Sequence, residues 1–382
     1  MKYVSVAAFS LCLLLAGVSP AADSLNVRLI GRSLPRGNDV DVKGGYAFVA
    51  GRDSGLHVIS VIDPAHPTEI AHYDMPGPAF GVVVSGSYAY VADWSGGLRV
   101  VSVADPSQPT EVGHYDAPRS VMRATVNDSH AYVLAESSLR VVSISDPAHP
   151  VEIGHCSMPD WCYSVAVSGH FAYVADFRSG LRVISVADPA YPREVGHNDS
   201  LGDLVTVAVS GKYAYTADDY FGLSVVSIDD STHPFEVGFC DTPTSLNDIV
   251  VDNCAHAADG SFGLRVISVG NPSSPTEIGY YRLPGQGGGL AVDGSYAYVV
   301  GDSGLAVYQF YGAGVEETLS DGRATMDVKP TVVRSLTQGA TVFDAMGRRV
   351  VNPRSGVLFV QERSAAGGKP SAVSVRKVVI QR

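Results

Sequence analysis

The chain has few basic residues. Lysine and arginine total 27 of its 382 residues against 39 aspartates and glutamates, so the formal net charge is −12. A nucleic-acid partner requires clustered basic side chains, and this balance argues against one. We attribute the acidity to solubility.

Long apolar runs are missing beyond the first residues. Residues 1–22 hold a basic Lys2, an apolar run and small residues at Ala21 and Ala22, a pattern typical of a secretory signal peptide. The run is too short to span a membrane, and no later stretch is long enough. We therefore expect an extracytoplasmic protein that is secreted or held at the cell surface.

Cysteines are scarce, and four remain after the signal peptide. Cys156 and Cys162 are close enough in sequence for a local disulfide, which an oxidising compartment permits. The alternative is that all four are free and packed as small apolar residues. No spacing is typical of zinc, so we expect no metal and no cofactor. Ser–His–Asp spacing, a phosphate-binding loop and a dinucleotide motif are absent as well.

One unit of about forty residues is written seven times. Residues 96–114 read GGLRVVSVADPSQPTEVGH, and residues 179–197 read SGLRVISVADPAYPREVGH. Such repetition decides the architecture. The leucine of this phrase recurs at intervals of 41 or 42 residues, at Leu56, Leu98, Leu139, Leu181, Leu223, Leu264 and Leu305.

Each unit divides into four short strands. In the second copy they are centred on Val83, Tyr90, Val101 and Gly113, and they are rich in Val, Ile and Tyr. Ser-Gly, Asp/Gly-rich and Asp-Pro turn signals separate them, and the repeats show no helical period. Four-stranded units at this period predict an all-β fold, a seven-bladed β-propeller over residues 25–311.

The ends of the array distinguish a closed ring from an open solenoid. The seventh copy stops at Tyr311 without its fourth strand. Residues 27–35, VRLIGRSLP, are similar to the fourth-strand phrase EIGYYRLP of residues 277–284. We predict that this N-terminal strand completes blade seven, because closure covers edges that an open array would expose.

The third-strand phrases LRVISVADP and LRVVSISDP resemble those of the LVIVD-repeat family of bacterial propeller proteins. The resemblance covers about residues 25–311. It implies the propeller fold and an extracytoplasmic location. It implies no established chemistry.

The repeats end before a different C-terminal segment. Residues 312–327 are typical of a linker, and residues 328–382 contain four strand-like pieces. This segment resembles the C-terminal sorting domains of type IX secretion, although Leu358 replaces the usual Tyr. The resemblance implies a partner in the secretion or cell-surface attachment machinery; the alternative is an ordinary accessory β-domain. The matching residues are Pro330, Asp344, Gly347, Arg348, Val350, Gly356, Val357, Phe359, Val360, Lys377 and Val378.

Comparison among the seven copies separates constant turns from variable ones. The turns between first and second strands and the Asp-Pro connections hardly vary, so we assign His66, His149 and His233 in those connections to structure. The hairpins between second and third strands and the blade-to-blade loops vary, and both lie at the opposite face. We predict a non-catalytic module that binds a protein or glycan there, since aromatic and Arg side chains dominate binding surfaces. The alternative for any single aromatic is packing between blades. The candidates are Arg52, Trp94, Arg119, Trp161, Phe177, Arg178, Tyr220, Phe221 and Phe262.

Carboxylates recur just after the second strand, at Asp93, Asp176, Asp218 and Asp259. Calcium binding and acid–base chemistry use such groups. Their recurrence in four blades argues against a single site and favours turn capping.

The channel mouth is more selective. The first residue of the innermost strand is Asp39 in blade one, Asp248 in blade six and Arg123 in blade three. Paired carboxylates hydrolyse glycosides, so these three residues are the candidate site of an alternative function, an extracytoplasmic hydrolase or lyase. The simpler interpretation is that they are solvated polar residues lining the channel.

Overall fold

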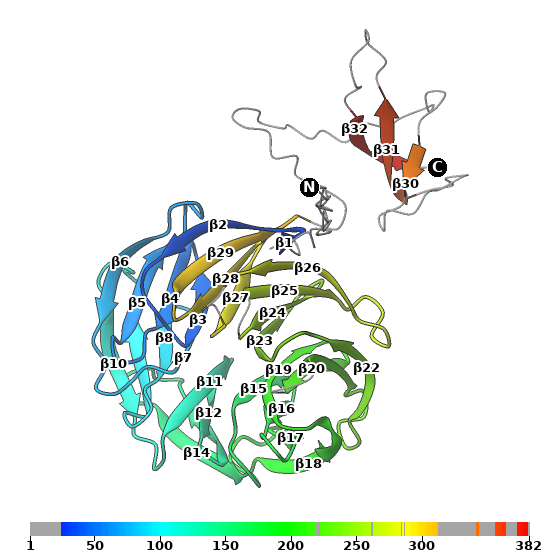
Figure 1. Ribbon diagram of the computed structural model, residues 1–382. Helices are drawn as coiled ribbons and strands as arrows, with labels where there is room; N and C mark the ends of the chain where they lie inside the picture. Colours follow the sequence, from blue (N-terminus) through cyan, green and yellow to red (C-terminus); the bar gives the residue numbers. More distant parts are fainter. Residues whose placement is uncertain are drawn as a thin grey trace, which may run out of the picture.

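The computed structural model describes residues 24–218, 222–260, 263–283, 285 and 287–311, together with the backbone of 341–343, 356–363 and 373–380. Seven antiparallel sheets form a ring, six with four strands and one with five (Figure 1). The one helical element among these residues is a single turn, η1 (Asp199–Leu201), which is far too short to cross a membrane. The predicted seven-bladed, all-β propeller is confirmed.

Every blade runs from an innermost strand outwards in chain order. Blades one to four comprise β3 (Asp39–Lys43), β4 (Tyr46–Ala50), β5 (Leu56–Ser60), β6 (Thr68–Tyr73), β7 (Gly81–Ser85), β8 (Tyr88–Ala92), β9 (Leu98–Ser102), β10 (Thr110–Tyr115), β11 (Val121–Asn127), β12 (His130–Ala135), β13 (Ser138–Ser143), β14 (Val151–Ser157), β15 (Ser164–Ser168), β16 (Phe171–Ala175), β17 (Leu181–Ser185) and β18 (Arg193–Asn198). Blades five to seven comprise β19 (Leu204–Ser210), β20 (Tyr213–Asp218), β21 (Gly222–Ser227), β22 (Phe235–Asp241), β23 (Leu246–Val251), β24 (Ala255–Asp259), β25 (Gly263–Ser268), β26 (Thr276–Arg282), β27 (Leu290–Asp293), β28 (Tyr296–Gly301) and β29 (Gly304–Phe310).

The N-terminal strand closes the ring. β2 (Val27–Ser33) pairs antiparallel with β29 and supplies the missing fourth strand of blade seven, as predicted. A second, unpredicted strand, β1 (Ser24–Leu25), pairs with β26 and adds a fifth strand to blade six. Asn26 joins the two with φ 54° and donates from Nδ2 to the Ile278 carbonyl at 2.6 Å. The chain thus crosses from the edge of blade six to that of blade seven.

The core lies between neighbouring blades. Each of the seven repeated leucines is at most 1% exposed. Leu56, for example, packs with Phe48 of its own blade and with Val82 and Val101 of the next. Fully burying one such side chain contributes about 1.5–3 kcal/mol. The repeated phrase is therefore the packing surface that every blade presents to the next.

A repeated glycine marks where the blades come closest. A Cβ on Gly154 would lie 2.4 Å from the Pro189 carbonyl oxygen of the next blade, and one on Gly196 would lie 2.3 Å from that of Ser231. Side chains have no room at such a distance, because non-bonded carbon and oxygen atoms require about 3 Å or more. The Gly of the fourth-strand phrase thus faces the constant Asp-Pro connection of the following blade.

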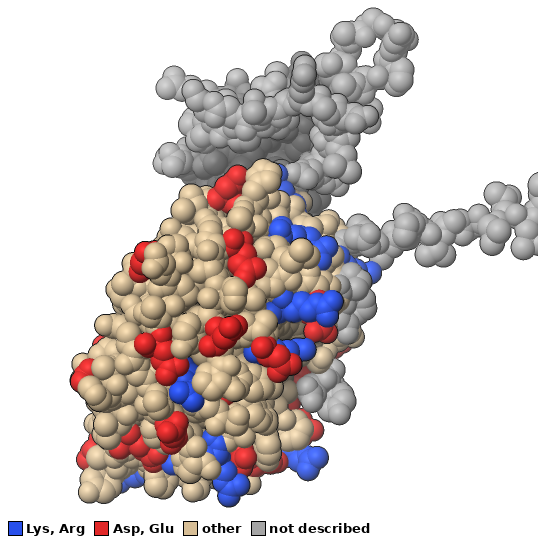
Figure 2. Space-filling view, turned by 90° about the vertical axis from the view of Figure 1, so that its left-hand side faces the viewer, with Lys and Arg blue, Asp and Glu red and all other residues tan. Residues whose placement is uncertain are grey.

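The outer side of the ring carries mixed charge. Figure 2 shows the side of β6 and β10, where acidic and basic side chains are interspersed. This side therefore offers no broad basic field to a polyanion.

The C-terminal segment contains a separate three-stranded sheet in the order β30 (Thr341–Phe343), β31 (Gly356–Arg363) and β32 (Val373–Ile380). Its strands are antiparallel. They match three of the four strand-like pieces, which are residues 328–334, 340–351, 355–362 and 375–382 of the sequence. The first piece, and the hairpin of Asp344, Gly347, Arg348 and Val350, lie outside the described residues.

Candidate binding face and channel mouth

Three charged residues meet at the mouth of the channel, as their places in the repeat predicted. Arg123 extends from β11 and donates from Nη1 to Asp248 at 3.1 Å and from Nη2 to Asp39 at 3.4 Å. We name Asp39, Arg123 and Asp248 the channel-mouth triad. It joins blades one, three and six across the channel.

The two carboxylates of the triad also connect adjacent blades. Asp39 accepts from the backbone N–H of Val40 and, across the blade boundary, from that of Val82, both at 3.0 Å. Asp248 accepts from Ile249 in its own blade and from Leu290 in blade seven, again at 3.0 Å. These side chains are buried, so they are not the solvated lining residues of the simpler interpretation.

Burial governs the ionisation of the triad. Desolvation raises the pKa of Asp39 to about 6, against the opposing effects of Arg123 and of two backbone N–H groups. For Arg123, burial disfavours the charge, but Asp248 and Asp39 together outweigh it and raise its pKa. A cation shared by two buried carboxylates is the arrangement expected of an ion network that fixes the ring.

The variable face has a periodic feature around this mouth. Four residues at equivalent hairpin positions have left-handed backbone: Arg52 (φ 57°), Trp94 (φ 34°), Glu136 (φ 51°) and Phe177 (φ 32°). We name these four the rim residues. Positive φ is costly for a side-chain-bearing residue and is retained where the surrounding structure imposes it. The backbone bridges Arg52–Ala79, Trp94–Val121 and Phe177–Leu204 attach this position to the next blade.

Each of three rim residues contacts a partner that precedes the innermost strand. The Phe80 and Trp94 rings lie 4.7 Å apart between centroids, and those of Tyr163 and Phe177 lie 5.3 Å apart. Arg52 donates from Nε to Asn38 Oδ1 at 2.5 Å. All six side chains are at least partly exposed. The rim therefore presents two aromatic pairs, in blades two and four.

The other candidate binding residues surround these pairs. Trp161 is 41% exposed. The exposed Arg178 guanidinium lies 5.3 Å from the centre of the Phe177 ring. Arg119 pairs with the rim residue Glu136 at 3.0 Å. Tyr220, Phe221 and Phe262 lie outside the described residues.

The aromatic pairing was missed from the sequence, although a signal existed. Phe80 and Tyr163 each directly precede an innermost strand, and neither was among the candidate binding residues. Each pair has the 14-residue separation of Asn38 and Arg52. A constant separation within a repeat predicts contact once the fold is known.

The recurring aspartates anchor blade connections. Asp93 is fully buried, accepts from the Gly77 N–H in the preceding loop at 3.0 Å and lies 3.4 Å from Arg99. Asp176 is equally buried and lies 3.6 Å from Arg182. The turn-capping interpretation thus needs correction, because these carboxylates hold the loop before the blade and an arginine of the third strand. Asp259 is held in the same way, because it accepts a hydrogen bond from the Thr244 hydroxyl in the preceding loop and pairs with Arg265 of the third strand. Asp218 is only partly buried.

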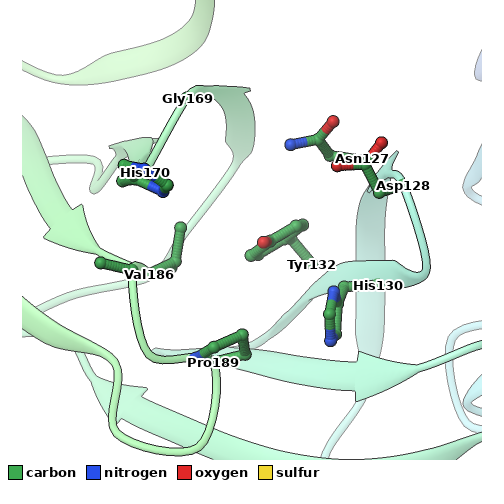
Figure 3. A pocket seen from close by; sticks show the side chains of 9 residues that line it. Asn127, Asp128, His130, Tyr132, Gly169, His170, Val186 and Pro189 are labelled. Atoms are coloured by element: carbon green, nitrogen blue, oxygen red, sulfur yellow. The ribbon is translucent and has the colours of Figure 1, made fainter.

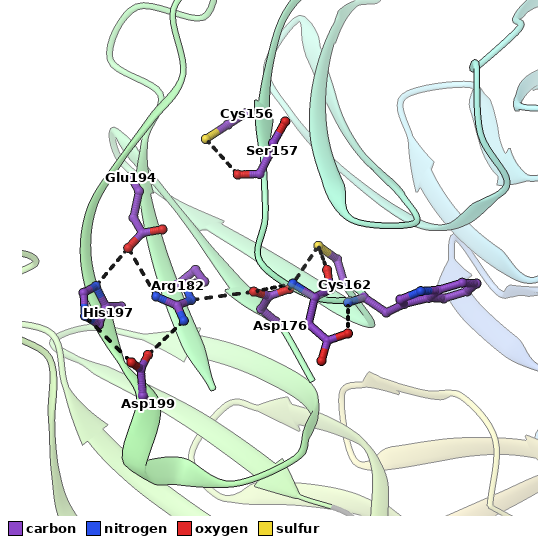
Figure 4. Close-up of polar contacts among 10 residues, drawn as sticks. Cys156, Ser157, Cys162, Asp176, Arg182, Glu194, His197 and Asp199 are labelled. Atoms are coloured by element: carbon purple, nitrogen blue, oxygen red, sulfur yellow. Dashed lines mark hydrogen bonds and ion pairs between the residues drawn. The ribbon is translucent and has the colours of Figure 1, made fainter. Parts of the chain in front are cut away.

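The cysteines are free in the structure, so the local disulfide is not formed. Figure 4 shows the Cys162 sulfur directed at Asp176, 3.7 Å from Oδ1, while Cys156 contacts the Ser157 carbonyl. Burial, and then the neighbouring Asp176 charge, raises the pKa of Cys162. A buried thiol with a raised pKa behaves as an inert apolar residue.

No group of three or more His, Cys, Asp or Glu side chains in the described part of the chain is arranged to hold a metal ion. The constant histidines pair within their own turns instead: His66 with Asp63 at 2.8 Å and His149 with Asp146 at 2.9 Å. They contribute to the Asp-Pro connections.

These observations define a seven-bladed β-propeller repeat protein with a variable rim around the mouth of a channel that an ion network crosses. The LVIVD repeat model matches residues 36–75, 76–117, 118–158, 162–199, 201–242, 247–282 and 284–307. The chain therefore belongs to the LVIVD-repeat family. No curated protein matches it.

Solved structures show the same fold at low identity. The WD40 repeats of RRP9 align with a TM-score of 0.59 and 14% identity over 74% of this chain and 97% of that one. The structure of U3-55K aligns with a TM-score of 0.58 and 14% identity, over 74% of this chain and 98% of that one. The computationally designed Ika8 protein aligns with a TM-score of 0.54 and 10% identity, over 71% of this chain and 83% of that one. Identities this low bear on the fold alone.

Proposed function

We propose that this protein is a secreted or cell-surface binding module without catalytic activity, and that its rim holds a protein partner. The two aromatic pairs, Phe80–Trp94 and Tyr163–Phe177, carry the proposal. Aromatic residues and arginine contribute most to protein interfaces, and here both are partly exposed on loops that differ between blades. A glycan is the alternative occupant of the same surface.

Affinity capture tests the rim. The bait is the chain from residue 23 onwards, exposed to cell-envelope and extracellular material of the producing organism. We expect the parent to retain a partner that the Trp94→Ala/Phe177→Ala variant loses, because both aromatic pairs are removed. The matched control is Tyr191→Ala, which removes a 78% exposed aromatic from a constant connection on the other face. Equal capture by the parent and the rim variant would reject the site.

A hydrolase or lyase centred on the channel-mouth triad is the second candidate. The pKa of about 6 for Asp39 favours it, since a general acid works best near the ambient pH. Both carboxylates, however, already accept from backbone N–H groups and from Arg123. An activity on glycosides that Asp39→Asn abolishes with the fold intact would establish the enzyme.

We also propose that residues 328–382 direct export or surface attachment. The three-stranded sheet formed by β30, β31 and β32 supports the β-rich character that a sorting domain requires. Deleting these residues should move the propeller from the cell surface or medium to the periplasm. Unchanged location would leave an ordinary accessory domain.

A further inference from the structure

A hollow of about 430 Å³ lies between blades three and four, at the face opposite the rim. The turn that joins β11 to β12 forms one wall, and the equivalent turn and the third-to-fourth-strand connection of blade four form the other. Figure 3 shows Tyr132 and His130 between these walls. The hollow is lined by Asn127, Asp128, His130, Tyr132, Gly169, His170, Val186, Ala187 and Pro189.

Several lining residues depart from the repeat. His130 occupies a position that holds tyrosine in blades one, two, five and seven, so a shorter side chain leaves space there. Asp128 has φ 52° at a position where five other blades use glycine with φ between 57° and 61°. His170 stands where blades two, three and seven have serine. Strain retained by a non-glycine residue is typical of functional positions.

The histidines provide an independent observation. The chain has eleven, all within the described residues. His130 and His170 are the two that lie more than 4.0 Å from every carboxylate among those residues, and both line this hollow. The other nine pair with Asp or Glu: His57, His66, His72, His114, His149, His155, His197, His233 and His256.

The unpaired groups define the chemistry of a ligand. Neutral imidazole, carboxamide and phenol groups each donate and accept hydrogen bonds, as hydroxyl groups do. Asp128 is the one carboxylate of the lining. Its negative charge would accept hydrogen bonds from the hydroxyl groups of a ligand and would repel an anionic ligand. The volume falls within the range of small-molecule sites. Asn127 and His130 are half-buried, whereas Asp128 and His170 are exposed. A half-buried polar group without a partner gains the most from a ligand that forms hydrogen bonds with it.

We propose that this hollow binds a neutral, polyhydroxylated small molecule, a sugar unit, through Asn127, Asp128, His130 and His170. The site is separate from the rim and does not depend on it. A propeller that binds a protein at the rim and a sugar in this hollow would hold the protein partner and the sugar at opposite faces of one molecule.

Calorimetry and histidine NMR on the full mature chain test the site. The probes are glucose, galactose, mannose, N-acetylglucosamine and cellobiose, with glucuronate as the anionic comparison. We expect a neutral sugar to bind and to shift the C2–H signals of His130 and His170 while the other nine stay in place. Binding should weaken about tenfold or more in the His130→Tyr/His170→Ser variant, because the larger tyrosine fills part of the hollow and the shorter serine withdraws its polar atom from it.

The variants are chosen to fold. Tyrosine and serine are the residues of other blades at these positions, so the double variant should keep the melting temperature of the parent. Asp128→Gly should raise that temperature while weakening the sugar, and Trp94→Ala should leave the sugar affinity unchanged. Failure of every probe, tighter binding of glucuronate, or unchanged affinity in the double variant would overturn the site. Loss of sugar binding in Trp94→Ala would place the ligand on the rim instead.

Discussion

Replacing Arg123 by methionine is expected to destabilise the propeller by about 3 kcal/mol or more at pH 8, because it leaves two buried carboxylates without their shared cation. The free energy of unfolding from denaturant titration measures the loss. Arg178→Met is the matched control. It removes an exposed guanidinium whose ring contact is worth about 0.5–1 kcal/mol.

The pH dependence identifies the cause. The pKa of Asp39 is raised from 3.8 to about 6 in the folded chain, so its contribution to stability is complete below pH 4 and is lost as the pH rises through 6. Arg123 opposes this shift, so Arg123→Met should raise the pKa of Asp39 further. The loss in the variant should then be smaller at pH 5 than at pH 8.

Removing the charges as well should restore part of the stability. The Arg123→Met/Asp39→Asn/Asp248→Asn variant keeps side-chain oxygens that accept from Val82 and Leu290, and it leaves no unpaired charge. A loss in Arg123→Met that is below about 1 kcal/mol, or that is equal at pH 5 and pH 8, would contradict a structural role for the triad.

Removal of the closing strand has the second large expected effect. A mature chain that begins at residue 34 lacks β1 and β2, so blade seven ends at an unpaired β29 and the buried Val27 is absent. We expect the melting temperature to fall by about 10 °C or more, since several kcal/mol of burial and strand pairing are lost.

A peptide added in trans provides the control. A synthetic peptide of residues 24–33 should restore the melting temperature by occupying the edge of β29, as strand addition does in other proteins. The same peptide with Gly31→Val should fail, because a Cβ there would lie 2.3 Å from the Pro64 carbonyl oxygen of blade one. An unaltered melting temperature in the shortened chain would contradict closure by this strand.

The repeat made most of this fold predictable. Seven copies of one phrase give the number of blades and the order of their strands, and the orphan phrase at residues 27–35 indicates how the ring closes. The meeting of Arg123 with Asp39 and Asp248 followed from their places around the ring. Repeats therefore predict side-chain contacts wherever symmetry alone brings residues together.

Contacts that depend on the departures of one blade were not predictable. In blade six, His256 stands at the position where most other blades have a buried tyrosine. The ring of Phe310 packs against it, with 6.5 Å between the ring centres. Phe310 stands where other blades have valine or isoleucine, so a larger side chain in blade seven offsets a smaller one in blade six. Strand β1 was missed because two residues carry too little pattern to predict a strand.

Site-specific photo-cross-linking tests the binding role of the rim most directly. A benzophenone amino acid at the exposed position of Ser95, beside Trp94, is compared with one at Tyr191 on the opposite face. Both chains are irradiated in the envelope and extracellular material of the producing organism. The proposed function predicts a discrete cross-linked partner from position 95 and none from position 191. Cross-linking from position 191 alone, or equally from both positions, would contradict it.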